Sequence, residues 1–191
     1  MTSAAKHGLT PSQTVGPYLH IGLDWLTITE LAPVGVSGER IVIQGQLLDA
    51  DREPIPDGMV EIWQANAQGK YAHPDDPRAL PLEAGFQGFG RVATDEHGRF
   101  RFSTIKPGSV PDAHGRPQAP HLLVNVFARG LLRQLVTRMY FPGDAHETDS
   151  VLQQVPVARR ATLVASAAGA GVVEWHVRIG GGADETVFFE L

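Results

Sequence analysis

The stretch GRVATDEHGRFRFSTI, residues 90–105, decides the fold class. Apolar and polar residues alternate on both sides of a polar TDEHG segment at residues 94–98. Alternation with period two is typical of a β-strand with one buried face, and a glycine suits a turn position with positive φ. We therefore predict two antiparallel strands, residues 90–93 and 99–105, joined as a β-hairpin.

Similar alternation recurs on both sides of this pair. The further candidate strands cover residues 40–48, 59–65, 121–128, 134–141, 161–165, 172–179 and 185–189. Residues 121–128 are almost continuously apolar, which predicts a strand buried on both faces. Helix is scarce, with at most a turn or two at residues 144–151. Roughly eight or nine short strands with frequent turn residues predict an all-β fold, a single β-sandwich domain.

Two segments lack this alternation. Residues 1–38 are broken by Pro11, Gly16 and Pro17, yet they carry large apolar side chains that must cover something. We predict an irregular N-terminal arm, residues 1–38, that contacts a partner chain and precedes a sandwich domain of residues 39–191. Residues 66–88 form a proline-rich loop, and loops of that length in a compact domain are usually functional.

Composition excludes several functions. The 191 residues suit one domain, and a net charge of −5 without a basic run argues against nucleic-acid binding. The absence of cysteine excludes disulfides, zinc–thiolate sites and thiol nucleophiles. No apolar stretch is long enough for a signal peptide or a membrane span, so we expect a cytoplasmic protein without membrane contact.

Motifs for common chemistries are missing. The chain has no G-x-S-x-G elbow, P-loop or dinucleotide fingerprint. None of its eight histidines forms an H-x-H or H-x-x-x-H pair, so no local pair of metal ligands exists. An iron site built from tyrosinates and imidazoles would need most of the three tyrosines, Tyr18, Tyr71 and Tyr140.

Five runs, in order along almost the whole chain, match a known family. They are TPSQTVGPYLHIG (10–22), EIWQANAQGKY (61–71), GFGRVATDEHGRFRFSTIKPG (88–108), FARGLLRQLVTRMYFPGD (127–144) and ETVFFEL (185–191). In these runs the chain resembles the intradiol ring-cleaving dioxygenases, and most closely those members that pair with a homologous β subunit. The resemblance implies non-haem Fe(III) held by the β chain. It also implies cleavage of protocatechuate by O2 to 3-carboxy-cis,cis-muconate.

The family's catalytic chain binds iron through two tyrosines and two histidines. The first tyrosine matches Tyr71, whereas the second falls on Val110 in a Val-Pro-Asp run. The His-x-His pair falls on His121 and Leu123, and an arginine three residues before that pair falls on Gln118. The resemblance therefore implies that this chain has no metal ligands and no catalytic residues, and that Tyr71 and His121 are structural remnants.

The resemblance assigns the chain a second role. It implies that the arm residues Thr14, Gly16, Pro17 and Tyr18, together with Arg129, help to bind substrate in the partner's iron pocket. A phenol and a guanidinium suit the carboxylate of protocatechuate.

Other interpretations stay open. His73 or His114 could replace the missing ligands and make the chain a self-sufficient iron dioxygenase, or the chain could be a non-enzymatic ligand-binding sandwich. Tyr18 could only fill an apolar interface, and Arg129 could be an ordinary ion-paired arginine.

Overall fold

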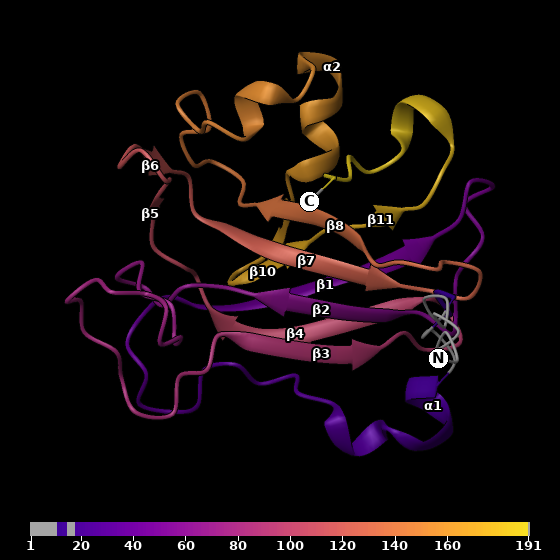
Figure 1. Ribbon diagram of the computed structural model, residues 1–191, viewed down its shortest axis with the longest axis horizontal. Coiled ribbons are helices and arrows are strands. Elements are labelled where there is room, and N and C mark those ends of the chain that lie inside the picture. The colour runs from indigo at the N-terminus through magenta and orange to yellow at the C-terminus, as the bar shows by residue number, and fades with distance from the viewer. Residues whose placement is uncertain (1–10, 15–17, 191) are drawn as a thin grey trace, which may run out of the picture.

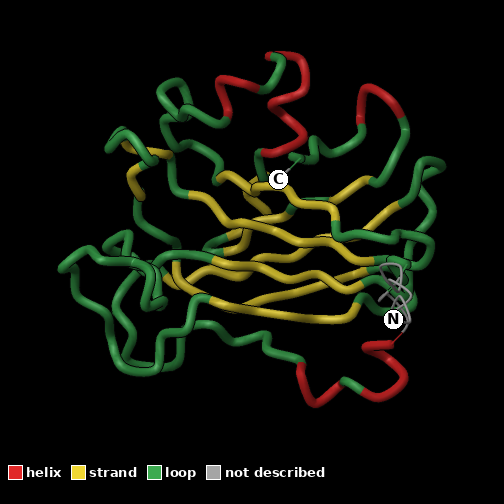
Figure 2. The backbone as a smooth tube through the Cα atoms, viewed as in Figure 1, coloured by secondary structure: helices red, strands yellow, loops and turns green. Residues whose placement is uncertain are grey.

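Two β-sheets packed face to face form the body of the chain (Figure 1). This computed structural model describes residues 11–14 and 18–190. The predicted site residues Gly16 and Pro17 lie outside the described residues. Strands occupy the centre and short helical segments lie at the periphery (Figure 2), which confirms the predicted all-β sandwich.

The first sheet is built around one long central strand. Its members are β1 (Arg40–Leu48), β4 (Arg99–Ile105), β9 (Ser166–Gly169), β10 (Val172–Glu174) and β11 (Val177–Arg178). Strand β4 pairs with β1 in antiparallel fashion on one side, and β10 and β11 pair with it in parallel on the other. The predicted strand at residues 172–179 is thus two short strands, separated by Trp175 and His176.

The second sheet carries the residues that the sequence singles out. Its strands are β2 (Met59–Trp63), β3 (Phe89–Ala93), β7 (His121–Phe127) and β8 (Leu135–Tyr140), in the order β3-β2-β7-β8. All of its pairs are antiparallel. A two-residue hairpin of β5 (Val110–Pro111) and β6 (Pro117–Gln118) lies near the start of β7.

The helical segments are all short. They are α1 (Tyr18–Gly22), η1 (Asp24–Leu26), η2 (Leu152–Gln154), α2 (Val157–Arg160), η3 (Ala161–Leu163) and η4 (Gly182–Asp184). Among the described residues no helix has the length and apolar character needed to cross a membrane.

Alternation along the strands builds the core between the sheets. Phe100 and Phe102 of β4 point into it, while Arg99 and Arg101, which alternate with them, are exposed. On β7 the row Leu122, Val124 and Val126 is fully buried in the same core. The residues between them are half-buried on the outer face, so the prediction that β7 is buried on both faces is wrong.

The turn at residues 94–98 forms as predicted, but the hairpin does not. Gly98 has φ +69°, and the Asp95 carboxylate accepts hydrogen bonds from the backbone N–H groups of His97 and Arg99 at 2.9 and 2.8 Å. Strand β3 then pairs in the second sheet and β4 in the first, so the turn joins the two layers. Gly90 allows this, because a Cβ there would lie 2.9 Å from the Phe102 ring of the opposite sheet.

Two other predicted strands are wrong. Residues 161–165 contain η3 and a single bridge from Val164 to Tyr140, because the apolar Leu163 packs in a separate small cluster. Residues 185–189 form no strand and contribute only a bridge from Phe189 to Val136. The arm also packs partly on its own domain: Ile28 bridges to β3, and Leu31 belongs to the main core.

A buried carboxylate joins three of these segments. Asp149 has no exposed surface and accepts hydrogen bonds from the Ala119 N–H at 2.9 Å and the Tyr140 hydroxyl at 3.0 Å. It also accepts from the N–H groups of Val151 at 3.0 Å and Leu152 at 2.8 Å. Asp149 therefore connects the segment before β7 to β8 and to η2.

Replacement of this carboxylate should be costly. Asp149→Ala would leave four donors without their acceptor in a buried place, so we expect the free energy of unfolding to fall by about 3 kcal/mol or more. Urea denaturation followed by circular dichroism measures the change. The exposed Asp51 supplies the matched control, since Asp51→Ala should change it by no more than about 0.5 kcal/mol. Equal effects of the two substitutions would contradict the assigned role.

Candidate functional site

The residues that match the family's ligand positions gather at one end of the second sheet. We call the cluster of Tyr71, Val110, Gln118, His121 and Leu123 the remnant centre. His121 begins β7, and Leu123 is paired with Trp63 of β2. Tyr71 stacks on Trp63 with ring centroids 6.1 Å apart and ring planes 3° apart. Val110 pairs with Gln118 in the hairpin that lies beside this cluster.

A buried ion-pair network fixes Tyr71 in place. The Lys70 ammonium donates to the backbone carbonyls of Asp76 at 2.6 Å and Arg78 at 2.7 Å. The Asp76 carboxylate accepts from the Arg78 guanidinium at 2.8 and 2.6 Å and from the Tyr71 N–H at 2.9 Å. These hydrogen bonds, those from Arg78 above all, hold the pKa of Asp76 far below its usual value. These contacts tie residues 70–78 of the predicted functional loop to one another beside Tyr71.

His121 is a buried, neutral imidazole. It is 4% exposed, and its Nδ1 lies 2.7 Å from the Ala119 carbonyl, which can only accept. Nδ1 therefore carries the proton, and Nε2 keeps its lone pair. Burial, and after it the positive charge of Arg138, lowers the pKa of His121 to about 4.

The remnant centre does not fit a ferric ion. Burial raises the pKa of Tyr71, which makes its phenolate harder to form. Val110 is buried and, like Leu123, has no donor atom. One phenol and one imidazole are too few ligands for tight binding. Within residues 11–14 and 18–190 no group of three or more His, Asp, Glu or Cys side chains could hold a metal.

Neither of the two histidines considered as substitute ligands belongs to a group that could hold a metal among the described residues, although His73 lines one hollow with Tyr71. His114 lies exposed in the turn that Asp112 caps. His73 meets Trp63 edge-on, with ring centroids 6.2 Å apart, and its side chain is half-exposed. Neither histidine completes a metal site with His121.

A second group of predicted residues lies at the other end of β7. The Thr14 hydroxyl donates to the Ala128 carbonyl at 3.0 Å, which brings the arm against the residue before Arg129. The Arg129 Nε donates to the Asp57 carboxylate at 2.6 Å, and the Arg129 side chain is 73% exposed. Tyr18 begins α1 and is 54% exposed. We call Thr14, Tyr18 and Arg129 the arm site.

A hollow of about 450 Å³ adjoins the arm site, and Asp57, Ala128 and Arg129 line it together with Ile55 and Leu131. Along the long axis of the molecule, α1 and the end of β7 lie at one end, and the β5–β6 hairpin lies at the other (Figure 1). At about 3.3 Å per strand residue, His121 and Arg129 are roughly 25 Å apart. The arm site and the remnant centre are therefore separate.

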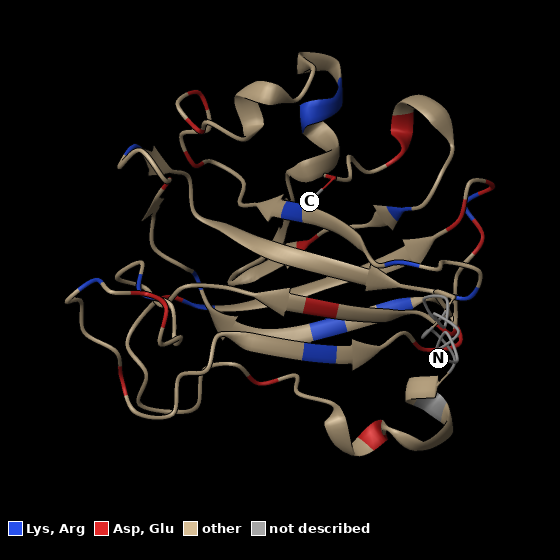
Figure 3. Cartoon of the chain, viewed as in Figure 1, with Lys and Arg blue, Asp and Glu red and all other residues tan. Residues whose placement is uncertain are grey.

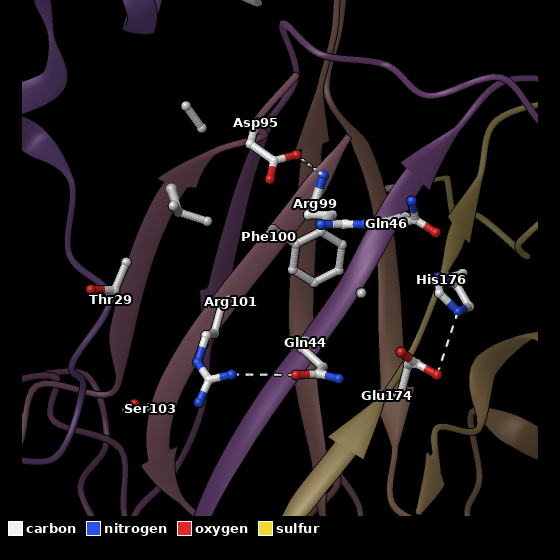
Figure 4. Close-up of a pocket in the computed structure, with 13 residues that line it drawn as sticks. Thr29, Gln44, Gln46, Asp95, Arg99, Phe100, Arg101, Ser103, Glu174 and His176 are labelled. Carbon is white, nitrogen blue, oxygen red and sulfur yellow. Dashed lines mark hydrogen bonds and ion pairs between the residues drawn. The ribbon is translucent and has the colours of Figure 1, made fainter. Parts of the chain in front are cut away.

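A further hollow lies on the outer face of the first sheet, away from the remnant centre and the arm site. It has a volume of about 840 Å³ and a polar lining that includes Gln44, Arg101, Glu174 and His176 (Figure 4). Arg101 points toward Gln44 in a long 3.4 Å contact, and His176 faces Glu174 at 3.8 Å. Acidic and basic side chains are mixed here, without a catalytic arrangement.

Charges on the second sheet are few and mostly paired. Figure 3 shows one acidic band on β2 beside one basic band on β3, and these are Glu61 and Arg91, which form an ion pair. The single basic residue of β8 is Arg138, which donates to the Gln118 side-chain oxygen at 2.6 Å. A lone arginine on a strand gives no sequence signal, and for that reason Arg138 was not among the predicted residues.

Comparison with known proteins gives one consistent family. The family model described as "Dioxygenase" matches residues 27–175. The protocatechuate 3,4-dioxygenase alpha chain of Pseudomonas putida is 38% identical over 95% of this chain and 96% of that relative. The alpha chain from Burkholderia cepacia is 40% identical over 95% of this chain and 97% of its own length. The beta chain from the same organism is 44% identical over 66% of this chain and 55% of its own length.

Solved structures share the fold. The intradiol ring-cleavage dioxygenase from Tetranychus urticae has a TM-score of 0.61 at 19% identity, covering 82% of this chain and 87% of its own. Catechol 1,2-dioxygenase from Pseudomonas arvilla C-1 has a TM-score of 0.57 at 22% identity, and the match covers 80% of this chain and 55% of that structure's chain. With the family model matching most of the chain and near-complete relatives at these identities, the chain belongs to the intradiol ring-cleaving dioxygenase family.

Proposed function

We propose that this chain is the α subunit of a protocatechuate 3,4-dioxygenase. Paired with a homologous β subunit, it would help O2 to cleave protocatechuate to 3-carboxy-cis,cis-muconate, in the β-ketoadipate route of aromatic catabolism. One observation carries the proposal: the arm site lies roughly 25 Å along β7 from the chain's own remnant centre. Residues that bind substrate at the arm site therefore act in the pocket of another chain.

The iron belongs to the β subunit in this proposal. The family relatives include both alpha and beta chains, which supports a hetero-oligomer of α–β units. The partner's non-haem Fe(III) would bind the catecholate oxygens and supply the activation of substrate toward O2. This chain supplies no ligand and no catalytic group, and the zero cysteine count suits the cytoplasm as its location.

The arm site has the chemistry to recognise the substrate's carboxylate. The ion pair with Asp57 engages Nε of Arg129 and fixes the side chain, so the terminal nitrogens form the part of the guanidinium that suits a second carboxylate. The Tyr18 phenol is exposed on α1 and can donate a hydrogen bond. Thr14 contacts the end of β7 beside Arg129, because its hydroxyl donates to the Ala128 carbonyl.

Apolar side chains beside the arm site support contact with the β subunit. Leu19 is buried on its own domain, whereas Ile21 and Trp25 on the same short segment are 75% and 78% exposed. Large apolar side chains at these exposures are typical of a surface that another chain covers. The predicted roles of Gly16 and Pro17 stay part of this proposal.

Substitution of Arg129 tests the pocket role in the α–β complex. We expect Arg129→Ala to raise the KM for protocatechuate at least about tenfold with a smaller change in kcat, because a charged hydrogen bond to the substrate is lost. The KM of Arg129→Lys should lie between those of the unsubstituted complex and Arg129→Ala. Asp57→Asn should raise KM less than Arg129→Ala does. Steady-state oxygen uptake measures KM and kcat for the unsubstituted complex and for each variant. The exposed neighbour Arg133 supplies the control Arg133→Ala, and an unchanged KM in Arg129→Ala would exclude the role.

Metal analysis tests where the iron is bound. Purified alone, this chain should hold no stoichiometric iron and show no turnover of protocatechuate, because Val110 and Leu123 provide no ligand atoms. The complex with a β subunit should contain about one iron per α–β pair, and His121→Gln in this chain should leave that ratio unchanged. Stoichiometric iron with activity in the isolated chain would instead favour a self-sufficient dioxygenase. Failure to form any complex would favour a non-enzymatic sandwich.

The pH dependence of stability tests the assignment of His121 as a buried neutral residue. Its pKa is about 4 in the folded chain and about 6.5 when unfolded, so the unfolded state takes up the proton first as the pH falls. The contribution to stability is complete above pH 6.5 and is lost toward pH 4. Between pH 7 and pH 5 we expect a loss of about 2 kcal/mol that His121→Gln abolishes. Urea unfolding at both pH values measures it, with the exposed His114→Gln as the control that keeps the loss.

A further inference from the structure

Strand pairing places Arg138 inside the remnant centre. Arg138 of β8 is the cross-strand partner of Leu123, and Tyr140 is the partner of His121. Directly paired residues of antiparallel strands project from the same face, so Arg138 and Leu123 share the outer face of the second sheet. The row continues through Trp63, on which Tyr71 stacks. A guanidinium thus stands beside the position that has lost its second histidine.

The contacts of Arg138 bind it to the same cluster. Its Nη1 donates to Gln118 Oε1 at 2.6 Å, and Gln118 pairs with Val110 in the β5–β6 hairpin. Gln118 stands where the resemblance places the family's arginine. The positive charge absent at Gln118 is therefore present in this centre, but it comes from the neighbouring strand.

The electrostatics of the surrounding groups agree with this placement. Burial raises the pKa values of Tyr71 and Tyr140, and in both cases the positive charge of Arg138 is the largest opposing influence. The same charge is the second cause, after burial, of the lowered pKa of His121. Arg138 thus acts on all three ring systems around the centre, whereas its hydrogen-bond partner Gln118 is uncharged.

We propose that the guanidinium of Arg138 is the built-in cation of the remnant centre. It takes the place of a metal ion, organises the same oxygen and nitrogen atoms, and keeps metals out of this chain even where a ligand is restored. A guanidinium stays protonated at all relevant pH values and offers five donors to surrounding lone pairs, those of Gln118 Oε1 among them. A divalent or trivalent cation entering the centre would meet a fixed like charge in a poorly solvated place.

Restoring one ligand with and without the charge tests this proposal. L123H adds a second imidazole two residues after His121, on the same strand face, next to Tyr71 and the preserved imidazole. The full-length chain is compared as L123H, L123H/R138Q, L123H/R138K and L123H/R133Q. Glutamine keeps an N–H donor without the charge, lysine keeps the charge, and Arg133 is an exposed arginine five residues away. Zinc ion is the probe, measured by isothermal titration calorimetry at neutral pH.

We expect L123H/R138Q to bind Zn²⁺ at least about tenfold more tightly than each of the other three proteins. Affinities within about threefold of one another across the four proteins, including no binding in any of them, would overturn the proposal. A gain in L123H/R133Q equal to that in L123H/R138Q would also overturn it, because net charge rather than position would then be the cause.

Circular dichroism and thermal unfolding establish that the compared proteins are folded. If L123H disrupts the strand, V110H replaces it and adds the imidazole from the hairpin side of the same centre. The four-way comparison and the two overturning outcomes stay the same. This test does not depend on the iron content of the α–β complex. The proposal about Arg138 can therefore fail while the proposed function stands, and the proposed function can fail while the proposal about Arg138 stands.

Discussion

The register of β7 is the constraint on which the rest of the structure depends. Leu122, Val124 and Val126 are buried between the sheets, and a shift by one residue would turn all three to the outside. This row fixes which residues face outward, so His121 and Leu123 fall at one end of the outer face. The same row carries the chain to Arg129 at the opposite end. One buried row therefore positions both the remnant centre and the arm site, roughly 25 Å apart.

Because the ligand positions lie outside the core, their loss leaves the fold intact. Leu123 is half-buried on the outer face, and Val110 sits in a two-residue hairpin rather than in either sheet. The core cluster that joins the sheets includes Phe100, Phe102 and Met139, and neither Leu123 nor Val110 belongs to it. In the proposed function, the chain keeps the scaffold that carries the arm site without metal chemistry of its own.

Sequence patterns predicted what depends on local chemistry and missed what depends on pairing. Alternation of apolar and polar residues predicted the strands at residues 40–48 and 99–105. The glycine at position 98 predicted the turn. The hairpin was wrong because a turn does not specify which strand its neighbour pairs with, and here Gly90 lets Phe102 pack across the layers. The contact of Thr14 with Ala128 and the place of Arg138 both span distant segments. No local pattern in a single sequence carries that information.

The chemistry of the remnant centre explains why it is not simply filled with apolar side chains. His121 is held by the Ala119 carbonyl with its lone pair directed away from that bond, and Gln118 presents a side-chain oxygen. Buried acceptors without donors are costly, so removal of a cation from such a place demands another donor. Arg138 of β8 donates to Gln118 Oε1 and meets this demand there without a cofactor. The loop of residues 66–88 and the β5–β6 hairpin can then keep their positions against the sandwich.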